Sequence, residues 1–115
     1  MTTTIWHNPR CSKSRLTLAL LEAQGIQPTV RLYLEDAPTS AELKSVLSQL
    51  GITPWDLLRR GEKIFKDLGL SKDTAETTLI TAMSQHPILI ERPVVIHGGK
   101  AVLGRPPENV LTILE

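Results

Sequence analysis

The chain's single cysteine, Cys11, lies in the segment HNPRCSKSR at residues 7–15. Three cationic side chains, those of Arg10, Lys13 and Arg15, are within four residues of it in the sequence. Neighbouring cations and a place at the start of a helix can lower a cysteine pKa from ~8.5 to ~3.5–7.5, and the thiolate is the nucleophile. Cysteine is often a buried core residue, but these polar neighbours favour a reactive thiol.

The residues around Cys11 limit the chemistry that it can perform. A redox pair would read C-x-x-C, but Ser14 occupies the position of the second cysteine. The Ser14 hydroxyl can donate a hydrogen bond to a thiolate but cannot form a disulfide, so an external thiol must complete any redox cycle. His7 has two interpretations that the sequence leaves open. It tunes or orients the thiolate, or it is a hydrogen-bonded residue at the end of a strand.

Anion binding is the second chemistry that the sequence suggests. The C-x5-R loop of phosphatases would need an arginine at position 17, and Thr17 excludes it. The loop could still bind an oxyanion through backbone N–H groups. Arg59, Arg92 and Arg105 each lie at a predicted element boundary, the last two directly before proline. Because a planar guanidinium can bind an oxyanion through two parallel hydrogen bonds, these three arginines are the candidate anion ligands.

Composition limits the class of protein. A chain of 115 residues with one cysteine suits a single domain without disulfides in a reducing compartment. The N-terminal sequence lacks the features of a signal peptide, and no stretch approaches the ~20 apolar residues of a membrane span. We therefore expect a soluble, cytoplasmic protein that is a monomer and does not bind membranes.

Charge and residue spacing argue against two further classes. The chain has 13 Lys and Arg residues and 12 Asp and Glu residues, and only 3% of its residues are aromatic. Nucleic acid is therefore a poor candidate partner. No His, Cys and Asp residues have metal-ligand spacing, so no metal site is expected. His86 and His97 are interpreted as structural. Arg10, Arg15 and Arg60 are interpreted as surface charges, although the first two are close enough to affect the thiol.

The strands that would position these residues follow from apolar patterns. TTIWH at 3–7 and TVRLYL at 29–34 have the β-branched or alternating residues of strands. VVIH and KAVLG flank Gly98-Gly99, which predicts a hairpin.

Helical patterns fill the remainder of the chain. A first helix capped by Ser12 or Ser14 should end at Gly25. Helical fragments follow between residues 36 and 86, and a last amphipathic helix begins after Arg105-Pro106-Pro107. The order β-α-β, helices, β-β-α predicts an α/β protein with a thioredoxin-like fold and an inserted helical subdomain.

The predicted domain is single, with a core at about 1–35 and 87–115 and an insertion at about 36–86. Thioredoxin-like folds place a cis-proline before the third strand, facing the reactive thiol. By this analogy with the fold, the peptide bond between Arg92 and Pro93 is expected to be cis.

Four motifs in this order, HNPRCSKSR, LLRR, HPILIERPVV and GRPPE, resemble those of the glutaredoxin-coupled arsenate reductase family. The resemblance covers essentially the whole chain and implies the same thioredoxin-like fold with a helical insertion. It matches Cys11 to the nucleophile, His7 and Ser14 to positions that modulate the thiolate, and three arginines to the oxyanion ligands: Arg59, Arg92 and Arg105.

The reaction that the resemblance implies is reduction of arsenate to arsenite. Cys11 would attack arsenic(V), glutathione would act as co-substrate, and glutaredoxin would clear the mixed disulfide, with no bound cofactor. The need for an external thiol agrees with the single cysteine.

Two alternatives stay open. Better-characterised reductases have P-A-C-G-T-S-R in the loop, whereas this chain has Arg10, Ser12 and Lys13 at the variable positions. This difference leaves room for another oxyanion or a mixed disulfide as substrate of a glutathione-linked thiol enzyme. Some relatives of the fold are regulators that bind RNA polymerase, but those usually carry C-x-x-C, which Ser14 interrupts.

Overall fold

A computed structural model describes residues 2–114 of the chain. These residues form two compact units. The sheet unit contains residues 2–36 and 92–114, and the helical unit contains residues 37–91. The inserted segment therefore ends at residue 91, a few residues beyond the boundary expected from the sequence.

The sheet unit is built on four strands in the order β2-β1-β3-β4. β1 pairs parallel with β2 and antiparallel with β3, and β3 pairs antiparallel with β4. This is the α/β, thioredoxin-like arrangement that the sequence predicted. The elements of the unit are β1 (Thr3–Trp6), α1 (Ser12–Ala23), β2 (Thr29–Arg31), β3 (Val94–His97), β4 (Lys100–Leu103) and the 3₁₀ helix η2 (Pro107–Ile113).

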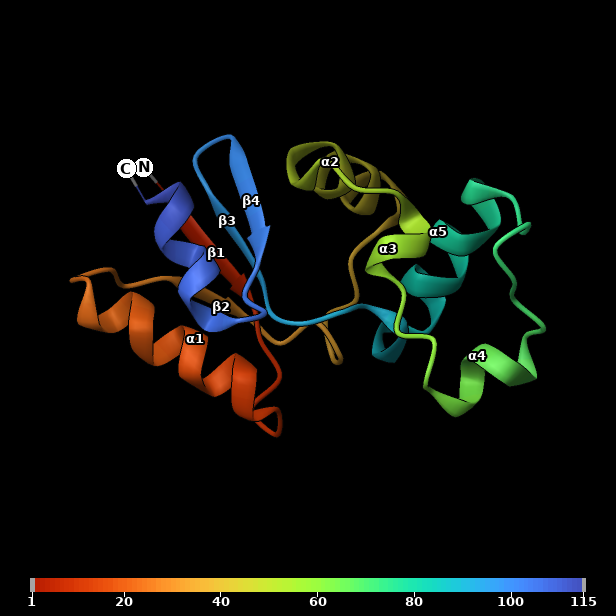
Figure 1. Ribbon diagram of the computed structural model, residues 1–115, viewed down its shortest axis with the longest axis horizontal. Helices are drawn as coiled ribbons and strands as arrows, with labels where there is room; N and C mark the ends of the chain where they lie inside the picture. The colour runs from red at the N-terminus through yellow and green to blue at the C-terminus, as the bar shows by residue number, and fades with distance from the viewer. Residues whose placement is uncertain (1, 115) are drawn as a thin grey trace. The chain divides into compact units, whose positions relative to one another are not determined.

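One face of this sheet carries the core of the unit. Ile5 of β1 lies opposite Val95 of β3, and both are fully buried. They pack with Leu21 from α1 and with Val110 and Ile113 from η2. Figure 1 shows α1 and the blue η2 lying beside each other against the strands. α1 is therefore fixed against the sheet through Leu21, and residues 7–11 connect β1 to its start.

Three details of the sheet unit differ from the sequence prediction. The cap of α1 is Cys11 rather than a serine. β2 ends at Arg31 because the chain turns there, with the N–H groups of Glu35 and Asp36 bonded to the carbonyl of Leu32.

The last predicted helix is a 3₁₀ helix rather than an α-helix. Pro106 and Pro107 remove N–H donors at its start. The amide N–H of Asn109 bonds to the carbonyl of Pro106 at 3.0 Å, three residues back, which is the 3₁₀ pattern.

The helical unit consists of short helices whose starts are capped. Thr39 and Glu42 form a capping box at the start of α2, and Thr53 and Asp56 form another at the start of α3. The helices are α2 (Ser40–Leu50), α3 (Pro54–Leu57), α4 (Lys63–Asp67), α5 (Glu76–Gln85) and the 3₁₀ helix η1 (Pro87–Leu89).

α5 is the centre of the helical unit, since α2, α3 and η1 all pack against it (Figure 1). An isolated bridge joins Leu58 to Ile90. In it the Arg59 N–H bonds to the Leu89 carbonyl at 2.7 Å, and the Glu91 N–H bonds to the Leu57 carbonyl at 2.8 Å. This bridge brings residues 57–59 and 89–91 side by side. Over residues 2–114, every helix is too short or too polar to cross a bilayer.

Candidate active site

A tight loop carries the chain from β1 to Cys11. The Cys11 N–H donates to the carbonyl of Asn8 at 3.0 Å, and the Asn8 side chain accepts from the Arg10 N–H at 3.0 Å. An asparagine that bonds the backbone two residues ahead closes a turn in this way. Cys11 itself is extended, with φ −94° and ψ 122°, and partly exposed at the first turn of α1. The thiol is therefore accessible and placed at a helix N-terminus.

Opposing influences set the pKa of the Cys11 thiol. Burial raises it, whereas the N–H of Ser14, the side chain of Arg92 and the N–H of Lys13 favour the charged form, and the resulting pKa is lower than the usual value. The Cys11 side chain makes no capping hydrogen bond in the structure, and these groups favour its charged form. Such a balance favours a nucleophile at neutral pH.

His7 is bonded to Ser14 beside this loop. His7 Nδ1 lies 2.7 Å from the Ser14 hydroxyl, which also accepts the N–H of Asn8 at 3.0 Å. His7 is 7% exposed and Ser14 is fully buried. Burial, and secondly the charge of Arg15, lower the pKa of His7 below 6.5, so the imidazole is neutral at pH 7.

The Ser14 hydroxyl therefore has a different set of partners from the one expected. The sequence suggested that it donates to the thiolate, whereas it is occupied by His7 and Asn8. Ser14 instead favours the thiolate through its backbone N–H. A helix start at Cys11 places that N–H at the third helical position, where amides remain free to bind the cap.

Arg92 and Arg105 lie together in the sheet unit. The Arg105 guanidinium donates from Nη1 to the carbonyl of Arg92 at 3.1 Å. Each arginine precedes a cis-proline, and the Arg92–Pro93 bond is the one that the fold analogy predicted. The Arg105–Pro106 cis bond was not predicted. Since the Arg92 side chain also favours the Cys11 thiolate, Arg92 is the predicted arginine that acts on the thiol, and Arg105 lies against Arg92.

Arg59 belongs to the helical unit and is held by two carboxylates. Its Nη1 lies 2.6 Å from Glu91 Oε1, and its Nε lies 3.2 Å from Glu62 Oε2. Burial lowers the pKa of Arg59, but the charges and hydrogen bonds of Glu91 and Glu62 outweigh it and raise the pKa above its usual value. Sequence reasoning missed both carboxylates. Glu62 is signalled by its spacing of three residues, but nothing in the sequence signals Glu91.

Three residues interpreted from the sequence as structural or as surface charges have partners within the protein. His97 Nδ1 lies 2.6 Å from the Thr3 hydroxyl across the strands, Arg15 donates to the Pro9 carbonyl at 2.8 Å, and Arg60 covers the Trp55 ring at 4.8 Å. Among residues 2–114, no three His, Cys, Asp or Glu side chains gather closely enough to hold a metal ion.

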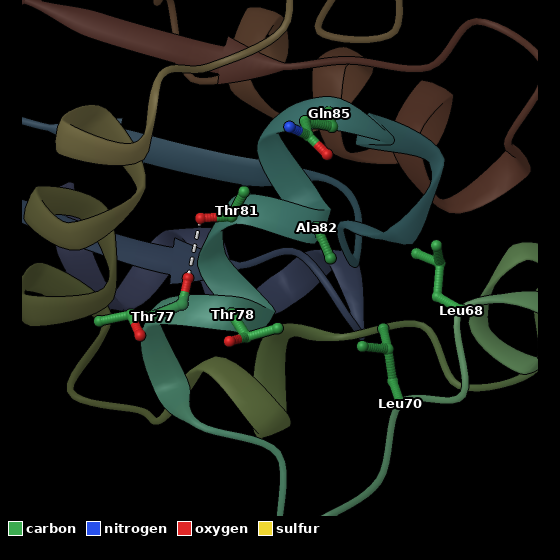
Figure 2. A pocket seen from close by; sticks show the side chains of 7 residues that line it. All are labelled: Leu68, Leu70, Thr77, Thr78, Thr81, Ala82 and Gln85. Atoms are coloured by element: carbon green, nitrogen blue, oxygen red, sulfur yellow. Dashed lines mark hydrogen bonds between the residues drawn. The ribbon is translucent and has the colours of Figure 1, made fainter.

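A pocket of about 330 Å³ lies in the helical unit, beside α5 (Figure 2). The hydroxyl of Thr81, one of its lining residues, bonds back to the carbonyl of Thr77 at 2.9 Å. The pocket has no acid, base or strong nucleophile, because its lining consists of Leu68, Leu70, Thr77, Thr78, Thr81, Ala82 and Gln85. This pocket therefore offers no group for the chemistry expected of Cys11.

Known proteins resemble this chain over nearly its whole length. The profile of the ArsC family matches residues 6–113. An arsenate reductase of Haemophilus influenzae is 49% identical over 99% of this chain and 100% of its own. The Escherichia coli protein named YfgD is 48% identical, over 96% of this chain and 94% of its own.

A solved structure extends the likeness to the fold. The structure of an arsenate reductase from Vibrio cholerae has a TM-score of 0.95 and 50% identity, and the match covers 99% of this chain and 98% of that one. This confirms the thioredoxin-like fold. The profile match and the relatives at about half identity establish that this chain belongs to the ArsC family.

Proposed function

We propose that this protein is an arsenate reductase whose nucleophile is the Cys11 thiolate. The observation that carries the proposal is the setting of Cys11, whose thiolate faces helix N–H groups and the guanidinium of Arg92. A nucleophilic sulfur and a fixed cation at one place suit attack on an oxyanion, because the cation offsets the repulsion between two negative groups. The relatives named arsenate reductase supply the substrate.

The first step forms a sulfur–arsenic bond. The Cys11 thiolate attacks arsenic(V), and one arsenate oxygen leaves as water after taking up protons from solvent. Arg92 neutralises the oxyanion beside the sulfur, and Arg105, which bonds the Arg92 carbonyl, supplies the second cation. Arg92 therefore has two tasks, stabilising the thiolate before arsenate arrives and holding the oxyanion afterwards.

The second step transfers two electrons to arsenic. The thiolate of glutathione attacks the Cys11 sulfur, a disulfide forms between them, and the electron pair of the broken sulfur–arsenic bond leaves with arsenic(III) as arsenite. Because Ser14 cannot resolve this mixed disulfide, a glutaredoxin thiol removes the glutathione and restores Cys11. The cycle needs a reducing compartment, and we place the protein in the cytoplasm as a monomer.

Arg59 of the helical unit is the third arginine that the resemblance matches to an oxyanion ligand. Its guanidinium is already bonded to Glu62 and Glu91, so an oxyanion must compete with these carboxylates for it. We therefore expect Arg59 to contribute less to anion affinity than Arg92. His7 and Ser14 complete the proposed site as modulators of the thiol, through the bond between their side chains and the Ser14 N–H.

A coupled assay tests this function. NADPH consumption is followed with arsenate, glutathione, glutaredoxin and glutathione reductase for the wild type, Cys11→Ser and, as matched control, the exposed neighbour variant Ser12→Ala. Arsenate-dependent consumption should fall to background in Cys11→Ser and persist in Ser12→Ala. Turnover that survives in Cys11→Ser would refute the mechanism.

The same assay distinguishes arsenate reduction from the main alternative, a different substrate for the same thiol. If the wild type has no arsenate-dependent turnover but Cys11 is alkylated rapidly, the activated thiol stands and the substrate is a different oxyanion or a mixed disulfide. The positive charges of Arg10 and Lys13 beside Cys11 are the feature that favours this alternative.

A further inference from the structure

Thr17 of α1 carries a buried hydroxyl that the proposed reaction does not use. The residue is fully buried. Its Oγ1 donates to the carbonyl of Lys13 at 2.8 Å and makes a longer bond to the carbonyl of Gly104 at 3.3 Å. The Lys13 carbonyl is also in reach of the helical N–H four residues on, so the hydroxyl is not needed to satisfy it. A helical threonine commonly bonds the carbonyl four residues back in this way, and here the bond gives the Lys13 carbonyl a second donor.

The peptide that the Thr17 hydroxyl bonds links it to Cys11. The Lys13 carbonyl and the Ser14 N–H belong to one planar peptide group. Among the groups that favour the Cys11 thiolate, the Ser14 N–H has the largest effect. A hydrogen bond to the carbonyl end of a peptide polarises its N–H end and strengthens the bond that the N–H donates. Thr17 therefore acts on the Lys13–Ser14 peptide, whose N–H end favours the Cys11 thiolate.

Gly104 holds the Thr17 side chain in the orientation that the bond to Lys13 requires. A Cβ on Gly104 would lie 2.6 Å from Thr17 Oγ1, 2.9 Å from Thr17 Cγ2 and 2.8 Å from Pro93 Cγ. The Gly104 N–H donates to the Pro93 carbonyl at 2.9 Å. Thr17 is thus enclosed by the residues that follow Arg92 and precede Arg105, and its hydroxyl has little freedom to turn away from Lys13.

We propose that Thr17 is a positioning residue for the Cys11 nucleophile, acting through the hydrogen bond from its hydroxyl to the Lys13–Ser14 peptide. This rests on the proposed function only in taking Cys11 as the reacting group. Thr17 occupies the position where the C-x5-R loop of phosphatases would need an arginine. The proposal gives Thr17 a different role, which is to favour the thiolate of Cys11.

Matched variants of Thr17 test the proposal. Thr17→Val removes the hydroxyl and keeps the shape, whereas Thr17→Ser keeps the hydroxyl and removes a methyl group. The rate of Cys11 alkylation by iodoacetamide is measured as a function of pH, with circular dichroism to verify folding. The Val variant should raise the pKa of Cys11 by about 0.5, which lowers the thiolate fraction in acid about threefold. The Ser variant should follow the wild type.

Either of two results would overturn the proposal. Identical pH profiles for the wild type and Thr17→Val would show that the hydroxyl does not act on the thiol, and equal shifts in the Val and Ser variants would assign the effect to packing. If the Val variant does not fold, Thr17→Ala takes its place in the same comparison. Alkylation needs no arsenate, glutathione or glutaredoxin, so failure here is distinct from failure of the reductase assay.

Discussion

At the scale of single residues, the thiol of Cys11 depends on groups that come from two directions. The amides of Lys13 and Ser14 come from its own helix, and the guanidinium of Arg92 comes from the segment before β3. In the proposed reaction, the helix amides keep their place and keep the sulfur ionised during the attack, while Arg92 turns to the incoming oxyanion.

The pH dependence of Cys11 alkylation measures this balance. The pKa of the thiol is lowered. The thiolate fraction and the alkylation rate should therefore reach their plateau at a lower pH than those of a free cysteine, whose pKa is ~8.5. In Arg92→Ala the pKa should rise, since burial remains while the charge and hydrogen bond of Arg92 are lost. The matched variant Arg60→Ala should leave it unchanged. A wild-type midpoint near ~8.5 would contradict an activated thiol.

His7 gives a second pH-dependent prediction. Burial and Arg15 lower the pKa of His7 below its ordinary value of 6.5, so the unfolded chain takes up a proton more readily than the folded protein does. Its contribution to the free energy of unfolding should be fully present above pH 6.5 and lost as the pH falls through the lowered pKa. Urea unfolding of the wild type and His7→Asn, measured above and below pH 6.5, checks this. Equal pH dependence in both proteins would show that His7 is not the group responsible.

At the scale of elements, the close approach of α1 to the segment after β4 decides how Arg105 is placed. Gly104 has no positive φ and is required instead by space, because Thr17 and Pro93 occupy the volume of a Cβ. A larger residue would have to separate α1 from this segment. The placement of Arg105 therefore depends on Gly104, the residue directly before it in the sequence.

Gly104→Ala should destabilise the protein by about 1–3 kcal/mol, the usual cost of adding a methyl group to a packed site. Arsenate should also protect Cys11 of this variant less well against alkylation, because Arg105 is displaced. Gly99→Ala is the matched control, since a Cβ there meets nothing within 4 Å. Thermal unfolding and alkylation with and without arsenate make the comparison. If Gly104→Ala is as stable as Gly99→Ala, the prediction is wrong, and Thr17 and Pro93 can shift to make room for a Cβ.

The sequence predicted the elements where the signal is local. The hairpin around Gly98-Gly99 and the end of α1 before Gly25 are confirmed, because turn chemistry acts within a few residues. The cap at Cys11 was missed because two serines follow it and look like better caps. The 3₁₀ form of η2 was missed because helical periodicity does not distinguish it from an α-helix over seven residues.

The candidate site could be predicted less completely, since its contacts join distant residues. Cys11 was identifiable from its neighbours, and the motifs singled out Arg92 and Arg105. The bond between Thr17 and the Lys13 carbonyl, and the contact of Thr17 with Gly104, depend on packing between α1 and the strands. No pattern in a single sequence reports such packing.

At the scale of the whole molecule, charge is nearly balanced, with a formal net charge of +1. Long-range attraction of an oxyanion is therefore weak, and anion affinity must come from particular arginines. One of the three candidates, Arg59, shares its charge with Glu62 and Glu91 in the helical unit. The single cysteine sets the other condition of the proposed mechanism, which is that an external thiol must complete the reduction.

A single-turnover experiment without glutaredoxin measures that condition directly. The protein is mixed with arsenate and glutathione, arsenite is quantified, and the intact mass of the protein is recorded, with Cys11→Ser as the control for direct reduction by glutathione. We predict one arsenite per protein above the control, matched by one glutathione disulfide on Cys11, and renewed turnover only after glutaredoxin is added. Repeated arsenite production without glutaredoxin, or arsenite formed without the disulfide, would contradict a mechanism that depends on one cysteine and an external thiol.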